Sequence, residues 1–211
     1  MLELVTDGDT RSIVAGGLRL AFRWTGDRWE HALERRQPGE ARSLVVARTI
    51  EGDPDRDDPA RVVSPAYQQL EFQGDGATRQ ALLVGQSGPH HFSAVFAVEE
   101  VPRDDRPGAS RAIIIRVDVA DRCRTPVEAL ACTYLVDAVS DDLVDAGPSL
   151  IAWDLGPDRL TFAATEPARV ALAEGGRRAT QVQALAGPAP GSSTRRCLYS
   201  WRWSPDSRRA T

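Results

Sequence analysis

The chain of 211 residues contains no lysine and no asparagine, and its only methionine is Met1. All 26 basic residues are therefore arginine, against 30 acidic residues, and the formal net charge is −4. Lysine, asparagine and methionine share AT-rich codons, so this bias is typical of a GC-rich genome. A nucleic-acid-binding domain normally carries a basic stripe and a pI above about 9, whereas the pI here is about 5.5. We therefore do not expect nucleic acid as a partner.

Long apolar runs are also missing. No segment approaches the ~18 consecutive apolar residues that a membrane-spanning helix requires. The first ten residues lack the basic and apolar regions of an export signal, so we expect a cytoplasmic protein without membrane contact. The three cysteines, Cys123, Cys132 and Cys197, have no CxxC spacing and lie in or beside apolar runs. We expect them to be reduced and buried, and we expect neither a metal site nor a cofactor.

Catalytic sequence motifs are absent. The chain contains no GxSxG element, no P-loop, no HExxH and no GxGxxG after a predicted strand. Each of these motifs carries a specific mechanism, such as a nucleophile, a phosphate cradle or a zinc site. Their absence favours a binding or structural protein over an enzyme.

Alternation of apolar and polar residues is the dominant pattern that is present. About a dozen short segments alternate in this way and are separated by Gly, Pro and Asp turns, which is typical of an all-β sandwich. We expect one large antiparallel β-sandwich domain over residues 1–203 and a flexible tail over residues 204–211. Apart from the hairpins below, the expected strands are Leu2 to Thr6, Ser12 to Ala15, Ser43 to Arg48, Tyr67 to Phe72, Gln80 to Gln86, His91 to Val98, Arg111 to Val119 and Arg196 to Trp203.

One hairpin has a register that two independent signals support. A two-residue turn at Gly26 and Asp27 places glycine where a positive φ is needed. The turn pairs the apolar face as Trp24 with Trp29, Phe22 with His31 and Leu20 with Leu33. The opposite face then pairs Arg23 with Glu30 and Arg19 with Glu34, so opposite charges are aligned.

Two further hairpins are predicted downstream. A turn centred on Pro157 and Asp158 sets Trp153 opposite Phe162 and Leu155 opposite Leu160. A three-residue loop after Glu174 sets Glu174 opposite Arg178 and Val170 opposite Val182.

The segment near residues 126–138 matches two patterns. Thr125, Pro126 and Glu128 fit a helix-capping box, and the apolar residues after them fit helical spacing. Leu130, Cys132, Tyr134 and Val136 also alternate as in a strand. We expect a strand there in an otherwise β chain, and at most one short helix.

The order of elements from Ile113 to Asp137 resembles the middle of galactose mutarotase-like supersandwich proteins. An alternating strand, a polar turn and a second strand follow one another in both. In that family the second strand carries a His-x-Tyr or His-x-Phe element. The aligned positions here are Cys132 and Thr133, so the resemblance implies a supersandwich-like fold without the catalytic histidine of the mutarotases.

Aromatic and histidine side chains on the predicted strands are the candidates for ligand contacts. Core filling is the alternative for each of them, and we leave both interpretations open. Neighbouring strand residues point to opposite faces, so we expect one of His90 and His91 to be buried and the other exposed. The candidate ligand-binding residues are Trp24, Trp29, His31, His90, Tyr199, Trp201 and Trp203.

The leading hypothesis is a β-sandwich that binds a ligand and catalyses no reaction. Carbohydrate is the favoured ligand class because of the aromatic rows and the supersandwich resemblance. An alternative is a sugar-active enzyme of epimerase or mutarotase type, with His31 or His91 as acid or base and Glu71 as partner. A second alternative is an assembly module that pairs through a sheet edge.

Overall fold

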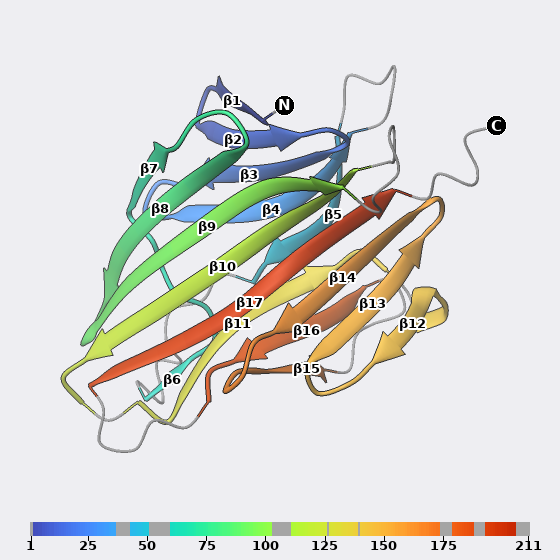
Figure 1. Cartoon of the computed structure of the whole chain (residues 1–211). Helices are drawn as coiled ribbons and strands as arrows, with labels where there is room; N and C mark the ends of the chain where they lie inside the picture. Colours follow the sequence, from blue (N-terminus) through green and yellow to red (C-terminus); the bar gives the residue numbers. More distant parts are fainter. Residues whose placement is uncertain are drawn as a thin grey trace.

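Two antiparallel sheets pack face to face and are not closed into a barrel (Figure 1). The structure is a computed structural model, and it describes residues 2–36, 43–50, 60–102, 111–125, 127–138, 140–173, 179–187 and 193–205. The predicted all-β sandwich is confirmed. The described residues form 17 strands, more than the dozen expected, and the unexpected ones include the short strands β6 and β12.

The first sheet, sheet I, holds the N-terminal strands. In pairing order it consists of β1 (Leu2–Asp7), β2 (Thr10–Ala15), β3 (Leu18–Trp24), β4 (Trp29–Arg36), β5 (Ser43–Thr49), β11 (Ala129–Val136), β16 (Thr180–Leu185) and β15 (Arg169–Ala173), with β6 (Arg61–Val62) parallel beside β11.

The second sheet, sheet II, lies in front of sheet I in Figure 1. In pairing order it consists of β12 (Leu143–Ala146), β13 (Leu150–Leu155), β14 (Asp158–Ala164), β17 (Thr194–Pro205), β10 (Arg111–Cys123), β9 (His90–Pro102), β8 (Thr78–Ser87) and β7 (Gln69–Gln73).

The core lies between the sheets and is built from alternate residues of each strand. β9 shows the period most clearly, because the side chains of Phe92, Ala94, Phe96 and Val98 are buried and those between them are more exposed. Side chains of a strand point alternately to its two faces, so each sheet contributes one apolar face to the shared core. The hydrophobic pattern of the sequence therefore specifies which face of each strand points inward.

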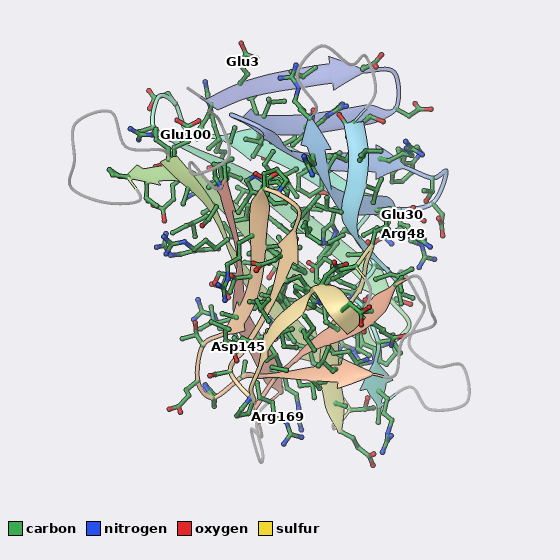
Figure 2. The ribbon with its side chains drawn as sticks, turned by 90° about the vertical axis from the view of Figure 1, so that its right-hand side faces the viewer. Glu3, Glu30, Arg48, Glu100, Asp145 and Arg169 are labelled. Atoms are coloured by element: carbon green, nitrogen blue, oxygen red, sulfur yellow. The ribbon has the colours of Figure 1, made fainter. Side chains whose placement is uncertain are left out.

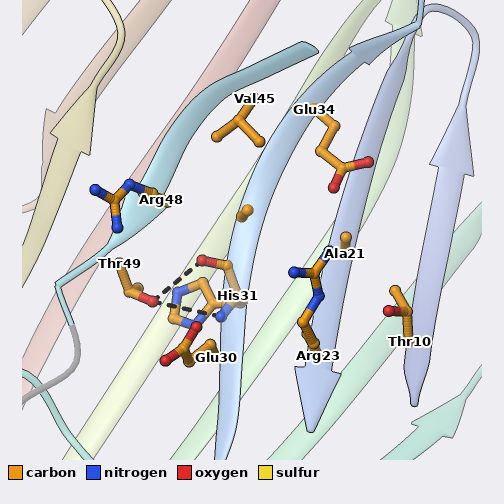
Figure 3. Close-up of a pocket in the computed structure, with 10 residues that line it drawn as sticks. Thr10, Ala21, Arg23, Glu30, His31, Glu34, Val45, Arg48 and Thr49 are labelled. Atoms are coloured by element: carbon orange, nitrogen blue, oxygen red, sulfur yellow. Dashed lines mark hydrogen bonds between the residues drawn. The ribbon is translucent and has the colours of Figure 1, made fainter. Parts of the chain in front are cut away.

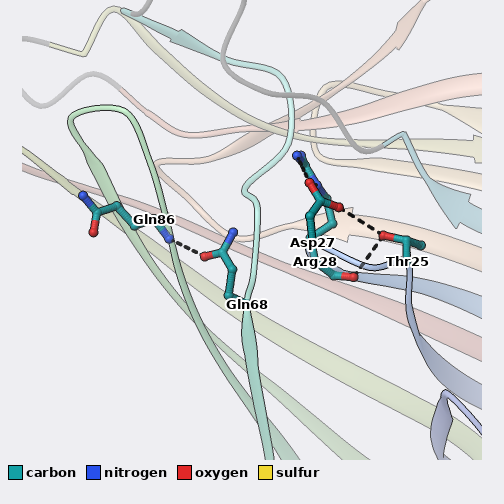
Figure 4. Close-up of polar contacts among 5 residues, drawn as sticks. All are labelled: Thr25, Asp27, Arg28, Gln68 and Gln86. Atoms are coloured by element: carbon teal, nitrogen blue, oxygen red, sulfur yellow. Dashed lines mark hydrogen bonds and ion pairs between the residues drawn. The ribbon is translucent and has the colours of Figure 1, made fainter.

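The first predicted hairpin is confirmed in every pair. Trp24 faces Trp29, Phe22 faces His31 and Arg23 faces Glu30 across β3 and β4. Gly26 has a φ of 103°, and the Thr25 N–H donates to the Arg28 carbonyl at 2.9 Å. The Thr25 hydroxyl donates to the same carbonyl at 3.1 Å (Figure 4). The turn therefore contains two residues, as predicted.

The second predicted hairpin forms with a different register. Trp153 faces Leu160 and Leu155 faces Asp158, whereas Ile151 is the residue that faces Phe162. The turn lies one residue earlier than predicted, because Gly156 takes a φ of 71° at its first position. Glycine tolerates a positive φ without steric cost, so it sets the turn in place of the Pro-Asp pair.

The third hairpin is also shifted. Leu172 faces Val182 and Val170 faces Ala184, so the register of β15 and β16 is shifted by two residues from the predicted one. The predicted pair of Glu174 and Arg178 lies outside the described residues.

The ambiguous segment near 126–138 is a strand. β11 pairs with β5 on one side and with β16 on the other. Pairing on both sides supplies partners for its backbone groups, and this tertiary context outweighs the helical spacing. The short 3₁₀ helix Ser140–Asp142 follows it and is the only helix among the described residues. At the C-terminus β17 continues through Pro205, so Ser204 and Pro205 belong to the sheet and not to the predicted tail.

Both ends of β4 are tied to the opposite sheet. At its start the Trp29 N–H donates to the Tyr67 carbonyl at 2.7 Å, just before β7. Near its end Arg35 Nε lies 3.2 Å from Asp158 Oδ2 at the turn between β13 and β14. β4 is therefore held firmly, and its outer face carries the hollow described below.

Candidate functional site

The aromatic row at the C-terminus belongs to the core. Tyr199, Trp201 and Trp203 are 3%, 1% and 2% exposed. Trp201 stacks on Phe162 with ring centroids 4.3 Å apart. These three residues therefore contact the interior of the sandwich and present no platform on either outer surface.

Trp24 and Trp29 are only partly buried, at the end of the first hairpin. Their ring centroids are 5.5 Å apart. The guanidinium of Arg11 lies 5.4 Å from the Trp29 ring centroid, so a cation–π contact covers part of this pair.

His31 points from sheet I into the core and begins a chain of hydrogen bonds. Its Nε2 lies 2.8 Å from the Tyr134 hydroxyl, which lies 2.6 Å from the Tyr199 hydroxyl of sheet II. Burial lowers the pKa of His31 to about 3, because desolvation disfavours the imidazolium. Burial also raises the pKa of Tyr199 well above its usual value. His31 and Tyr199 are therefore neutral near pH 7, and the chain of hydrogen bonds through Tyr134 links the two sheets.

His90 points into the core from sheet II, and its partner is a carboxylate. Its Nδ1 lies 2.8 Å from Asp121 Oδ2, and both side chains are fully buried. Burial raises the pKa of Asp121, although the hydrogen bond from His90 opposes this shift. Neither residue lines the hollow over β2 to β5 or the two hollows on sheet II that include Gln68 and Ser93, and because both side chains are fully buried we interpret the pair as part of the core.

His91 points outward, as expected from its neighbour His90. It lines a shallow hollow on sheet II together with glutamines. There the Gln86 N–H donates to Gln68 Oε1 at 2.7 Å (Figure 4).

The three catalytic candidates are not brought together. His31 faces the core, whereas His91 and Glu71 are on the outer face of sheet II. Glu71 faces Leu82, which faces Val95, four residues along β9 from His91. At about 3.4 Å per residue, this offset alone is about 13 Å. An acid–base site built from these groups requires hydrogen-bond reach, which the arrangement does not provide.

A hollow lies on the outer face of sheet I, over β2 to β5, and has a volume of about 210 Å³. The small side chains of Ala21 and Ala32 face each other across β3 and β4 and form its floor. Its remaining lining residues are Thr10, Arg23, Glu30, His31, Glu34, Val45, Arg48 and Thr49 (Figure 3).

The hollow lies where β5 separates from β4. Leu33 faces Ala47 whereas Glu34 faces Val45, so Val46 is an extra residue that forms a bulge in β5. A bulge bends its strand and increases the local twist. The backbone pairing between β4 and β5 ends at Ala32 and Arg48.

Thr49 replaces the missing backbone pairing beyond this point. Its Oγ1 accepts a hydrogen bond from the His31 N–H at 3.4 Å and donates to the His31 carbonyl at 3.1 Å (Figure 3). The backbone of His31 therefore lines the hollow while its imidazole lies on the other side of the sheet.

Charged side chains surround the alanine floor. Glu34, which lines the hollow, forms an ion pair with Arg19 at 3.5 Å, and Arg19 also donates to the Ser12 hydroxyl at 3.0 Å. Arg23, Glu30 and Arg48 form no ion pair or side-chain hydrogen bond within the described part of the chain. Although Arg23 and Glu30 face each other as predicted, their side chains do not pair. Glu30 of β4 and Arg48 of β5 both line the hollow and lie on the same side of the molecule in Figure 2.

Sequence reasoning missed this hollow because it searched the apolar strand faces. The available signal was on the other face of the first hairpin, where Ala21 and Ala32 occupy outward positions between charged residues. Register alone places these two alanines opposite each other. The contribution of Arg48 depends on β5, whose bulge no sequence pattern indicated.

The fold and this hollow define an antiparallel two-sheet β-sandwich with a polar surface site. No protein-family model matches the chain, and no curated protein matches its sequence. Among the described residues, no helix is long and apolar enough to cross a membrane.

Proposed function

We propose that the chain binds a small carbohydrate in the hollow on sheet I and catalyses no reaction on it. The observation that carries this proposal is the combination of an alanine floor with Arg23, Glu30 and Arg48, which have no ion-pair partners in the described part of the chain. Ligand sites typically combine an apolar surface with a few directed polar groups. A sugar ring offers both, with C–H groups for the alanines and hydroxyls for the charged groups.

The size of the hollow favours a single ring. Its volume of about 210 Å³ lies below the roughly 300–1,000 Å³ of sites for drug-sized molecules. The Ile113–Asp137 resemblance to supersandwich proteins supports carbohydrate as the ligand class. No disulfide links the three buried cysteines, all of which the structure describes, and this supports the cytoplasm as the compartment.

Calorimetric titration with a panel of monosaccharides tests the proposal. Ala32→Leu fills the floor of the hollow and is expected to abolish binding. Ala97→Leu is the matched control, because Ala97 occupies an outward position on β9 away from the hollow. Absence of binding at millimolar concentration, or equal binding by both variants, would contradict the proposal.

A second candidate is assembly through the edge of sheet I, because β1 is an open edge strand. Leu4 and Val5 are 43% and 36% exposed there. An exposed edge strand can pair with a strand of another chain. If it does, light scattering will show a dimer in the wild type and a monomer in Leu4→Lys, whereas a monomeric wild type would exclude this candidate.

A further inference from the structure

We propose that the ligand of the sheet I hollow is a monosaccharide that carries a single carboxylate, a sugar acid. This inference rests on the proposed function and specifies its ligand class. Its basis is the charge balance of the hollow. Arg19 and Glu34 neutralise each other at 3.5 Å. Arg23, Arg48 and Glu30 remain and give the site one net positive charge, which matches a ligand with one negative charge.

The register places Glu30, the carboxylate of the site that has no ion pair, between two arginines. Glu30 on β4 faces Arg23 on β3. On the other side of β4, Arg48 faces Ala32, the next outward position after Glu30. Glu30 therefore has a cation on each neighbouring strand and forms an ion pair with neither (Figure 3).

This arrangement assigns a distinct role to each charged group. A guanidinium binds a planar carboxylate through two parallel N–H···O bonds, so Arg48, which is exposed on β5, binds the ligand carboxylate. Glu30 only accepts hydrogen bonds when ionised, so it accepts them from ligand hydroxyls. Ala21 and Ala32 contact the ring between these two ends.

Other ligand charges fit less well. A neutral sugar would take Arg48 out of water without supplying a counter-charge, which is costly. A phosphate ester has close to two negative charges, and Glu30 would repel the excess. One carboxylate balances the site without leaving an uncompensated charge.

The test uses matched pairs of sugars that differ only at C6: glucuronate with glucose, and galacturonate with galactose. We expect calorimetry to show at least tenfold tighter binding of the acid in one pair. Raising the salt concentration from 0.15 M to 1 M should reduce this preference, because salt screens exposed charges. Glucose 6-phosphate is expected to bind more weakly than glucuronate.

Two variants assign the preference to the site. Arg48→Gln should bring the acid-to-neutral affinity ratio close to one, whereas Arg202→Gln should leave it unchanged. Arg202 is the matched control because it is exposed on β17 of sheet II, on the other side of the molecule. Near-ultraviolet circular dichroism checks that both variants keep the native fold.

The possible failures are distinguishable. If the neutral sugars bind as tightly as the acids, the sugar-acid inference is overturned and the proposed function stands. If the phosphate ester binds most tightly, the charge argument is wrong. If no sugar of either pair binds, both the inference and the proposed function fail.

Discussion

Two histidines are buried in the same core, one from each sheet, and their partners differ in kind. His31 of sheet I contacts a tyrosine hydroxyl, whereas His90 of sheet II contacts the carboxylate of Asp121. Both side chains are almost completely inaccessible. The difference teaches that burial alone does not decide how an imidazole affects stability, because the chemistry of its partner sets the cost of removing it.

The two sites also respond to pH in opposite directions. Burial lowers the pKa of His31 to about 3, so the folded protein binds fewer protons there than the unfolded chain. Burial raises the pKa of Asp121, so the folded protein binds more protons at this site. The first change favours folding at higher pH and the second at lower pH. Five predictions test this contrast.

Removing the carboxylate beside His90 should have the largest effect. Asp121→Ala removes the carboxylate that lies 2.8 Å from the buried His90 imidazole, and we expect the free energy of unfolding to fall by about 3–5 kcal/mol. Urea denaturation measures it. Asp118→Ala, which removes a half-buried partner of Arg196 from the outer face of the same strand, should cost less than about 1 kcal/mol. Equal losses in the two variants would show that the buried pair has no special importance.

The acid dependence of stability should identify His31. Unfolded His31 takes up a proton below its ordinary pKa of 6.5 and the folded protein only near pH 3. Its contribution is complete above pH 6.5 and is lost as the pH falls toward 3, by up to about 1.4 kcal/mol per pH unit. His31→Gln should therefore flatten the decline in urea stability between pH 6.5 and 4.5. An unchanged slope would show that the folded imidazole accepts a proton.

Asp121 provides the opposite slope in the same measurement. Its stabilising contribution is complete below its ordinary pKa of 3.8 and is lost as the pH rises through the raised pKa of the folded state. Asp121→Asn should remove this loss, so its stability should gain relative to the wild type as the pH rises from 3.8.

Truncating the chain of hydroxyls should have a smaller effect than losing Asp121. Tyr199→Phe removes one end of the chain and leaves Tyr134 bonded to His31, so we expect a loss of about 1–2 kcal/mol. Tyr134→Phe removes the central hydroxyl and both bonds, and should cost more. Thermal and urea unfolding of both variants measure these two losses of stability. A larger loss for Tyr199→Phe than for Tyr134→Phe would contradict the proposed chain of hydrogen bonds.

The outward histidine should have the smallest effect. His91→Ala changes an exposed side chain next to His90, and we expect the free energy of unfolding to change by less than about 0.5 kcal/mol. A loss comparable to that of Asp121→Ala would mean that the two imidazoles act together.

The accuracy of the sequence predictions depended on how many local signals agreed. In the first hairpin the turn glycine, the apolar face and the charge pairs of Arg19 and Arg23 all indicated one register, and that register is observed. In the second hairpin the prediction relied on Pro157 and Asp158, but Gly156 sets the turn. Local patterns of this kind cannot exclude a two-residue shift in strand pairing. After such a shift the same residues of each strand still point inward, so the hydrophobic pattern fits both registers.

The sequence by itself determined the all-β class, the inward face of most strands and the burial of one histidine of the pair His90–His91, because alternation along a strand is a local property. Only the tertiary structure decided what each inward or outward side chain meets. Tyr134 and Asp121 become histidine partners, and Arg48 joins Glu30 beside an alanine floor, because strands distant in sequence pair or pack across the core. Strand order and the β5 bulge fix these contacts through the packing of the whole sandwich, which the alternation of single strands does not encode.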